Sequence, residues 1–295
     1  MNRPDLLTTL ASRTLVCDGG MGTQLLSLGI KSGDCSMLWN VDRAGDVRMI
    51  HDAYLNAGSE LLTTNTFGGS SLALERHGLA DRAAELNRAG ARIAREAAGD
   101  RAWVLGDVGP FGDFLEPLGD TTADELRASF RAQIEALLEG GADAILVETM
   151  SDPAETEVAI QAAREAAPDA PVLATHAFQK TGPGVFNTMM GSTVEETVRR
   201  SIDAGAHIVG TNCGTSLDLD DYVELGKQLV AAAGGTPVMV QPNAGAPTMR
   251  GAETVYEATP EQFGVTAGSL LDVGVRIVGG CCGTTPEHLA YCRTS

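Results

Sequence analysis

A short phrase that recurs four times along the chain limits the possible fold more than any other feature of the sequence. In each copy a helix-like segment reaches a glycine, a turn of one or two residues follows, and an apolar run comes next. The copies are Ala57–Asn65, Gly141–Glu148, Gly205–Cys213 and Gly274–Cys281. Glycine commonly ends helices, and a short continuous apolar run is typical of a strand buried on both faces. The phrase therefore predicts repeated helix-to-parallel-strand units.

Further strands and helices fill the intervals between the copies. Four more apolar runs are predicted strands: Thr14–Cys17, Ala102–Gly106, Val172–Thr175 and Pro237–Val240. Helical patterns cover Val47–Asn56, Arg82–Ala98, Ala123–Glu139, Pro153–Ala166, Val194–Ala204 and Pro260–Asp272. Eight strands that alternate with helices predict an α/β fold, a (β/α)8 TIM barrel, as a single domain over residues 1–295. A doubly wound open sheet is the alternative, but no G-x-G-x-x-G sequence supports a dinucleotide-binding fold.

The predicted strands end in polar side chains or in cysteine. Barrel enzymes place their chemistry at the carboxyl ends of the strands. Those ends are Asp18, Asn65, Asp107, Glu148, His176, Cys213, Asn243 and the pair Cys281–Cys282. Carboxylates, amides and thiols together predict a polar pocket at this face.

Three of the six cysteines stand apart from the others. Six cysteines in 295 residues are too sparse for a disulfide scaffold, and each of the remaining three is typical of a small buried hydrophobe. Cys213, Cys281 and Cys282 end the predicted sixth and eighth strands, and glycines on both sides of the pair allow a sharp turn. Three thiolates at one place suit zinc and leave its fourth position for a substrate thiol. Spacing alone leaves a metal site and buried thiols equally open.

Composition excludes several classes of partner. The formal net charge is −18 with only three lysines, so no basic surface is available for nucleic acid. No apolar run approaches the length of about 18 residues that a membrane span needs. The first ten residues contain no signal-peptide core. Together with the sparse cysteines, this predicts a cytoplasmic protein.

The chain resembles the homocysteine S-methyltransferase family. The likeness rests on Asp18–Thr23, on Asn212-Cys213 and on the GGCCGT element Gly279–Thr284, and it covers nearly the whole chain. The family contains betaine–homocysteine methyltransferases, S-methylmethionine-dependent enzymes and the first module of cobalamin-dependent methionine synthase. The resemblance implies a (β/α)8 barrel with zinc (Zn2+) on Cys213, Cys281 and Cys282, all in the catalytic site. It also implies homocysteine as the methyl acceptor and methionine as the product.

The resemblance also implies residues for the amino-acid end of homocysteine. Glu148 matches the family glutamate that binds the ammonium group, and Asp18 matches the aspartate of the first strand. Backbone N–H groups at Gly19 and Gly20 are available for the carboxylate. From the residues alone, Glu148 is equally readable as a helix cap or surface acid, and Asp18 as a turn former.

Two loops at strand ends match family loops with less specific roles. They contain Asn65 and Asn243, which we expect to orient the substrate, to orient residues around the substrate, or to cap turns. Gln241 stands where methionine synthase modules tend to have glutamate. The sequence leaves the roles of His176, Tyr256 and Gln241 undetermined.

The methyl donor is less constrained than the acceptor. A quaternary ammonium or sulfonium donor favours aromatic contacts, and Trp39 matches a tryptophan of the betaine enzymes. The tyrosines of the vertebrate cage align with Gly68 and Thr149, so that cage is incomplete. Similarity to short bacterial betaine enzymes favours a betaine-like donor. A methyl-corrinoid (methylcobalamin) on a separate corrinoid protein comes next, as in a split methionine synthase, and then S-methylmethionine.

Other classes of function remain as alternatives. A zinc-thiolate storage module would not need a complete substrate pocket. A zinc hydrolase or aldolase usually holds its metal with histidine and carboxylate, because three thiolates favour alkylation of a thiol. The sequence gives no prediction of oligomeric state, so a homo-oligomer is left open.

Overall fold

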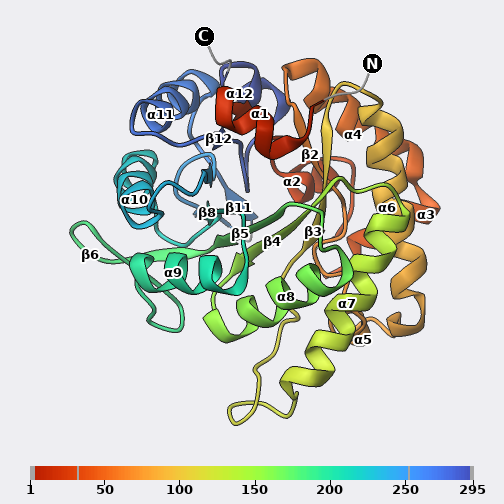
Figure 1. Ribbon diagram of the computed structural model, residues 1–295. Helices are drawn as coiled ribbons and strands as arrows, with labels where there is room; N and C mark the ends of the chain where they lie inside the picture. Colours follow the sequence, from red (N-terminus) through yellow and green to blue (C-terminus); the bar gives the residue numbers. More distant parts are fainter. Residues whose placement is uncertain (1–3, 32, 252, 293–295) are drawn as a thin grey trace.

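The computed structural model describes residues 4–31, 33–251 and 253–292, and a closed parallel barrel occupies its centre (Figure 1). The strands in sheet order are β1 (Leu15–Val16), β12 (Ile277–Val278), β9 (Val238–Gln241), β8 (Ile208–Asn212), β5 (Val172–His176), β4 (Ala144–Met150), β3 (Trp103–Val108) and β2 (Leu61–Thr63). Neighbouring strands in this order pair in parallel, and a parallel bridge between Cys17 and Leu61 joins its two ends. The predicted (β/α)8 barrel is confirmed.

Helices surround the strands (Figure 1). They are α4 (Ala44–Ala57), α6 (Ala83–Ala98), α7 (Ala123–Glu139), α8 (Pro153–Ala166), α9 (Val194–Ala204), α10 (Leu219–Ala232), α11 (Pro260–Asp272) and α12 (Pro286–Ala290). Thr122 and Thr259 begin α7 and α11 with capping boxes, because each hydroxyl accepts from a backbone N–H three residues on. Gly58 and Gly205 end α4 and α9 in the left-handed conformation, with φ of 108° and 110°. The recurring phrase therefore marks real helix ends.

Residues that alternate along the strands fill the interior of the barrel. One apolar cluster contains Leu15, Leu61, Leu105, Leu146, Leu173, Ile208, Met239 and Ile277. The short helix α1 (Leu6–Ser12) adds Leu6 and Leu10 to the same cluster and so closes the amino-terminal end of the barrel. Two residues further along four of these strands the inward positions become polar, at Thr63, Asp107, Glu148 and Gln241, and on β8 Asn212 follows Ile208 four residues on. The carboxyl end is thus lined by polar groups.

Several elements were not among those predicted. Helices α1 and α10 are two of them, and the smaller helical segments α2 (Met21–Ser27), η1 (Ser36–Leu38), α3 (Trp39–Asp42), α5 (Ser71–Glu75) and η2 (Ala80–Arg82) are others. Two hairpins also follow barrel strands: β6 (Phe178–Gly182) with β7 (Val185–Thr188), and β10 (Thr248–Arg250) with β11 (Glu253–Val255). The β6–β7 hairpin extends beyond the ring of helices (Figure 1). Among the described residues, no helix is both long and apolar enough to cross a membrane.

Candidate functional site: a thiol cluster beside buried carboxyl groups

The side chains of Cys213, Cys281 and Cys282 meet at the carboxyl end of the barrel. The Sγ atom of Cys282 lies 3.9 Å from that of Cys213 and 3.9 Å from that of Cys281. All three sulfur atoms lie within 4.8 Å of one another. These distances exclude disulfides, whose sulfurs are about 2.05 Å apart. Zinc–sulfur bonds of about 2.3 Å in a tetrahedral site place the sulfurs about 3.8 Å apart, so the spacing suits that metal.

Unusual backbone conformations bring the three thiols together. Cys213 follows β8 directly and has a φ of 55°, which is in the left-handed region that residues other than glycine rarely adopt. Gly214 follows with a φ of 107°. On the other side, Gly279 packs so closely that an added Cβ would lie 2.7 Å from Cys17 Cβ. This crowding explains why glycine is required between β12 and the cysteine pair.

Asn243 joins the two cysteine loops from the strand between them. Its Nδ2 donates to the carbonyl oxygen of Gly214 at 3.2 Å, and its Oδ1 accepts from the N–H of Cys282 at 3.1 Å. The hydroxyl of Tyr222 donates to the carbonyl oxygen of Cys213. Asn243 is buried, and both ends of its amide are occupied by the loops. Its position therefore fits a role in holding the ligand loops.

The thiols influence one another strongly. Hydrogen bonds from Cys213 and Cys281 lower the pKa of Cys282 to about 3, and Tyr256 contributes in the same direction. Hydrogen bonds with its two neighbours, together with burial, raise the pKa of Cys281 well above its ordinary value. Three sulfurs this close cannot all ionise without a cation between them. A divalent metal would supply that charge.

Three carboxyl groups lie next to the thiol cluster: Asp107 on β3 and Asp18 just after β1 are buried, and Glu148 on β4 is half-buried. Burial raises the pKa of Asp18 to about 7, although Thr63 donates to it through its N–H at 2.8 Å and its hydroxyl at 2.9 Å. Burial also raises the pKa of Glu148 to about 7. Asn212 Nδ2 donates to Glu148 Oε2 at 3.0 Å and lies 3.9 Å from Cys281 Sγ. The side-chain amide of Asn212 therefore lies between the carboxylate of Glu148 and the thiol of Cys281.

The two glycines after Asp18 make close contacts within the protein. The N–H of Gly20 donates to Thr284 Oγ1 at 3.0 Å. An added Cβ on Gly19 would lie 2.6 Å from the same oxygen. Both glycines therefore pack against the loop that follows the cysteine pair, and the N–H of Gly20 is already paired.

Asn65 and Trp39 belong to a different part of the barrel mouth. Asn65 Nδ2 donates to the carbonyl oxygen of Ser36 at 3.0 Å and to Asn40 Oδ1 at 2.9 Å. It therefore anchors the segment that contains Trp39. The guanidinium carbon of Arg43 lies 3.8 Å from the centre of the Trp39 ring. The Arg43 guanidinium therefore covers one face of the Trp39 ring.

The three residues of undetermined role have distinct positions. His176 is buried with its Nε2 3.3 Å from Thr156 Oγ1 on α8, so it lies outside the barrel interior. Tyr256 packs against Gly283, where an added Cβ would lie 2.3 Å from its ring. Gln241 Nε2 lies 3.8 Å from Cys17 Sγ, inside the polar layer.

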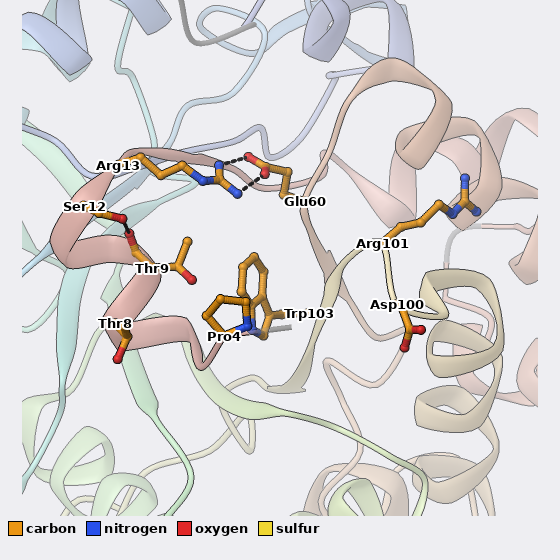
Figure 2. Close-up of a pocket in the computed structure, with 9 residues that line it drawn as sticks. All are labelled: Pro4, Thr8, Thr9, Ser12, Arg13, Glu60, Asp100, Arg101 and Trp103. Atoms are coloured by element: carbon orange, nitrogen blue, oxygen red, sulfur yellow. Dashed lines mark hydrogen bonds and ion pairs between the residues drawn. The ribbon is translucent and has the colours of Figure 1, made fainter. Parts of the chain in front are cut away.

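A hollow lies at the end of the barrel opposite the thiol cluster (Figure 2). Arg13 and Glu60 form an ion pair at its edge, with 2.5 Å between Nη2 and Oε1. Its lining residues precede β1 and β2 or begin β3, so they stand at the amino ends of the strands. We therefore assign the chemistry to the thiol face.

Fold and site together define a barrel with a thiol cluster at its catalytic face, and comparison with known proteins identifies the family. A family model described as homocysteine S-methyltransferase matches residues 15–294. The chain belongs to this family of methyltransferases.

Relatives and solved structures agree with this assignment. The methionine synthases of Mycobacterium leprae and Mycobacterium tuberculosis are each 33% identical to the chain over 97% of its length. The chain spans 24% and 25% of those two proteins, about a quarter of each. The homocysteine methyltransferase MmuM of Escherichia coli, in its metallated form, has the same fold, with a TM-score of 0.79 and 23% identity, covering 97% of this chain and 98% of that one.

The structure also contains site features that the sequence did not single out. Asp107 was expected only as a strand end, and it lies against Glu148. Asn212 was noted only as part of a motif. Its inward position follows from the alternation along β8, which is a signal that the sequence carries once the strand is known.

Proposed function

We propose that the chain is a zinc-dependent homocysteine S-methyltransferase that moves a methyl group from a donor to the thiolate of homocysteine, giving methionine. The observation that carries the proposal is the cluster of three thiols at tetrahedral zinc spacing beside buried carboxyl groups. Cys213, Cys281 and Cys282 would hold the metal. When bound, zinc lowers the pKa of a coordinated thiol and so provides a nucleophile at neutral pH.

The chain's own residues then position the substrate. Glu148, held by Asn212, would pair with the ammonium group of homocysteine, and Asp18 adds negative charge nearby. The homocysteine sulfur attacks the methyl carbon while the bond from that carbon to the donor breaks. The electron pair of the broken bond leaves with the donor, and the thiol proton is released to solvent.

A small cationic donor such as a betaine or a sulfonium compound is our first choice. Trp39 supports it, because its ring already binds the guanidinium of Arg43. A donor that uses this same face must displace Arg43. Arg43→Ala should therefore tighten donor binding, whereas Trp39→Ala should weaken it.

A methyl-corrinoid donor is the second candidate, with a separate corrinoid protein as partner. It is supported by exposed apolar side chains on segments that follow barrel strands, namely Phe67, Phe114, Met189 and Met249 of β10. Apolar groups around a mouth favour a large planar ligand or a protein surface.

A donor screen tests both candidates. Zinc-loaded protein and homocysteine would be incubated with glycine betaine, S-methylmethionine or methylcobalamin, and methionine would be measured by mass spectrometry. Methionine from a betaine or sulfonium donor, with opposite effects of Arg43→Ala and Trp39→Ala, is the expected result. Methionine from methylcobalamin alone would favour the second candidate. Failure of all three donors, with no corrinoid protein captured as a partner, would contradict the proposed function.

A further inference from the structure

We propose that Asp107 is a third acidic residue of the homocysteine site, where it pairs with Glu148 to bind the primary ammonium group of the substrate. This role rests on the proposed function and adds a specificity residue to it.

The surroundings of Asp107 leave one of its carboxyl oxygens without a hydrogen-bond donor among the described residues. The residue is the last but one of β3, and its side chain is 2% exposed. Its N–H donates to Thr64 Oγ1 at 2.9 Å and its carbonyl oxygen accepts from Thr66 Oγ1 at 2.8 Å, so neighbouring hydroxyls fix the backbone. Within the described part of the chain no donor reaches its Oδ1, which is fully buried. A buried acceptor without a donor is costly unless a ligand supplies one.

The charge around Asp107 indicates what kind of donor is missing. Its carboxyl group contacts that of Glu148, and Asp18 is close enough to repel both. Burial and this repulsion raise the pKa of Asp107 well above its ordinary value. Two carboxyl groups this close do not readily carry two negative charges without a cation beside them. An ammonium group would bring a positive charge and several N–H donors.

The position of the acid pair also indicates the length of the ligand. Asn212 Nδ2 lies 3.0 Å from Glu148 Oε2 and 3.9 Å from Cys281 Sγ. An amino thiol with a short chain can therefore reach both the acids and the sulfur cluster. A quaternary ammonium group has no N–H to offer to Asp107. The pair thus favours the acceptor substrate over a betaine donor at this subsite.

Binding of two thiols separates this role from a structural one. L-Homocysteine and 4-mercaptobutanoate differ only in the amino group, and calorimetry on zinc-loaded protein measures their affinities without any methyl donor. We expect the wild-type protein to bind homocysteine more tightly. Asp107→Asn should weaken homocysteine binding about 10- to 100-fold, the range for a hydrogen bond to a charged group. The affinity for 4-mercaptobutanoate should change less than about threefold.

A second variant and a matched control complete the test. Asp107→Ser removes the carboxyl group entirely and should behave like Asp107→Asn, which covers the case in which one variant does not fold. The control Asp143→Asn makes the same aspartate-to-asparagine change at the other end of the barrel, where Asp143 accepts from the N–H of Val104 at 2.7 Å. It should leave the affinities for both thiols unchanged.

Equal losses for both thiols, or no loss for either, would overturn the role of Asp107. Equal affinity of the wild-type protein for the two thiols would also overturn it. If the wild-type protein binds neither thiol, the proposed function itself fails.

Discussion

The residues of this site divide into those that face a ligand and those that hold other residues in place. Cys213, Cys281 and Cys282 present sulfur atoms to a common point, and Glu148 presents a carboxylate beside them. Asn243 was expected to orient substrate or neighbouring groups or to cap a turn, and its amide is hydrogen-bonded to the two cysteine loops. Residue type and position at a strand end predicted that the first group lies at this face, and the family resemblance implied its roles. Residue type and position could not separate the second, because a buried amide serves either purpose.

Removal of one ligand thiol should remove the metal. We expect close to one zinc per chain in the wild-type protein and much less in each of Cys213→Ala, Cys281→Ala and Cys282→Ala, because two thiolates hold zinc far more weakly than three. Elemental analysis of the purified proteins measures this. Cys35→Ser, which lies outside the cluster, is the control and should keep its zinc. Full zinc content in all three site variants would rule out the assignment.

At the scale of elements, the loops after β8, β9 and β12 act as one unit. Cys213 and the cysteine pair follow β8 and β12, and Asn243 follows β9, which lies between those strands in the sheet. Strand order places the three loops side by side, and the left-handed conformation of Cys213 turns its thiol toward the pair. The sequence predicted the three strands but not the conformation of their loops, because that conformation depends on partners about 30 to 70 residues away.

Loss of the Asn243 amide should loosen the metal site. Asn243→Ala leaves the carbonyl oxygen of Gly214 and the N–H of Cys282 without their partner, so we expect about 1–3 kcal/mol of destabilisation. Zinc affinity should fall about 10- to 100-fold, as is typical of residues that orient metal ligands. Competition with a chromophoric chelator measures the affinity. Asn65→Ala is the matched control, because Asn65 anchors Ser36 and Asn40 instead. Equal zinc affinity in Asn243→Ala and Asn65→Ala would contradict this role.

At the scale of the whole molecule, the apolar filling of the barrel and the polar candidate site lie at opposite ends. The amino-terminal end is closed by α1 and filled by apolar side chains, whereas the polar layer lies at the carboxyl end.

Buried titratable groups also occur outside the site. His51 on α4 is fully buried, and within the described residues neither of its ring nitrogens has a partner. Burial lowers the pKa of His51 to about 4.

This histidine should make the fold sensitive to acid. The unfolded chain binds a proton near pH 6.5, whereas the folded chain does so only near pH 4. The contribution of neutral His51 is therefore complete above pH 6.5 and is lost as the pH falls toward 4, by up to about 3 kcal/mol. His51→Leu should gain stability relative to the wild type across this window. Urea unfolding between pH 4 and 8 measures the difference in unfolding free energy between wild type and His51→Leu. The buried acids are the same in both proteins, so their titration cancels in this difference.

The exposed His77→Leu variant is the control for the chemical change. A difference in unfolding free energy between wild type and His51→Leu that stays constant from pH 8 to pH 4 would show that His51 does not titrate as burial predicts.

The sequence by itself determined the barrel and the meeting of the three thiols. Both follow from local patterns: a glycine that ends a helix, an apolar run that forms a strand, and the rule that parallel strands bring their carboxyl ends to one face. The tertiary structure alone decided how the polar side chains are used. It placed Asp107 against Glu148 and hydrogen-bonded Asn243 to the cysteine loops. These partners come from different strands and loops, so their contacts depend on side-chain direction in the folded chain, which no local pattern in the sequence encodes.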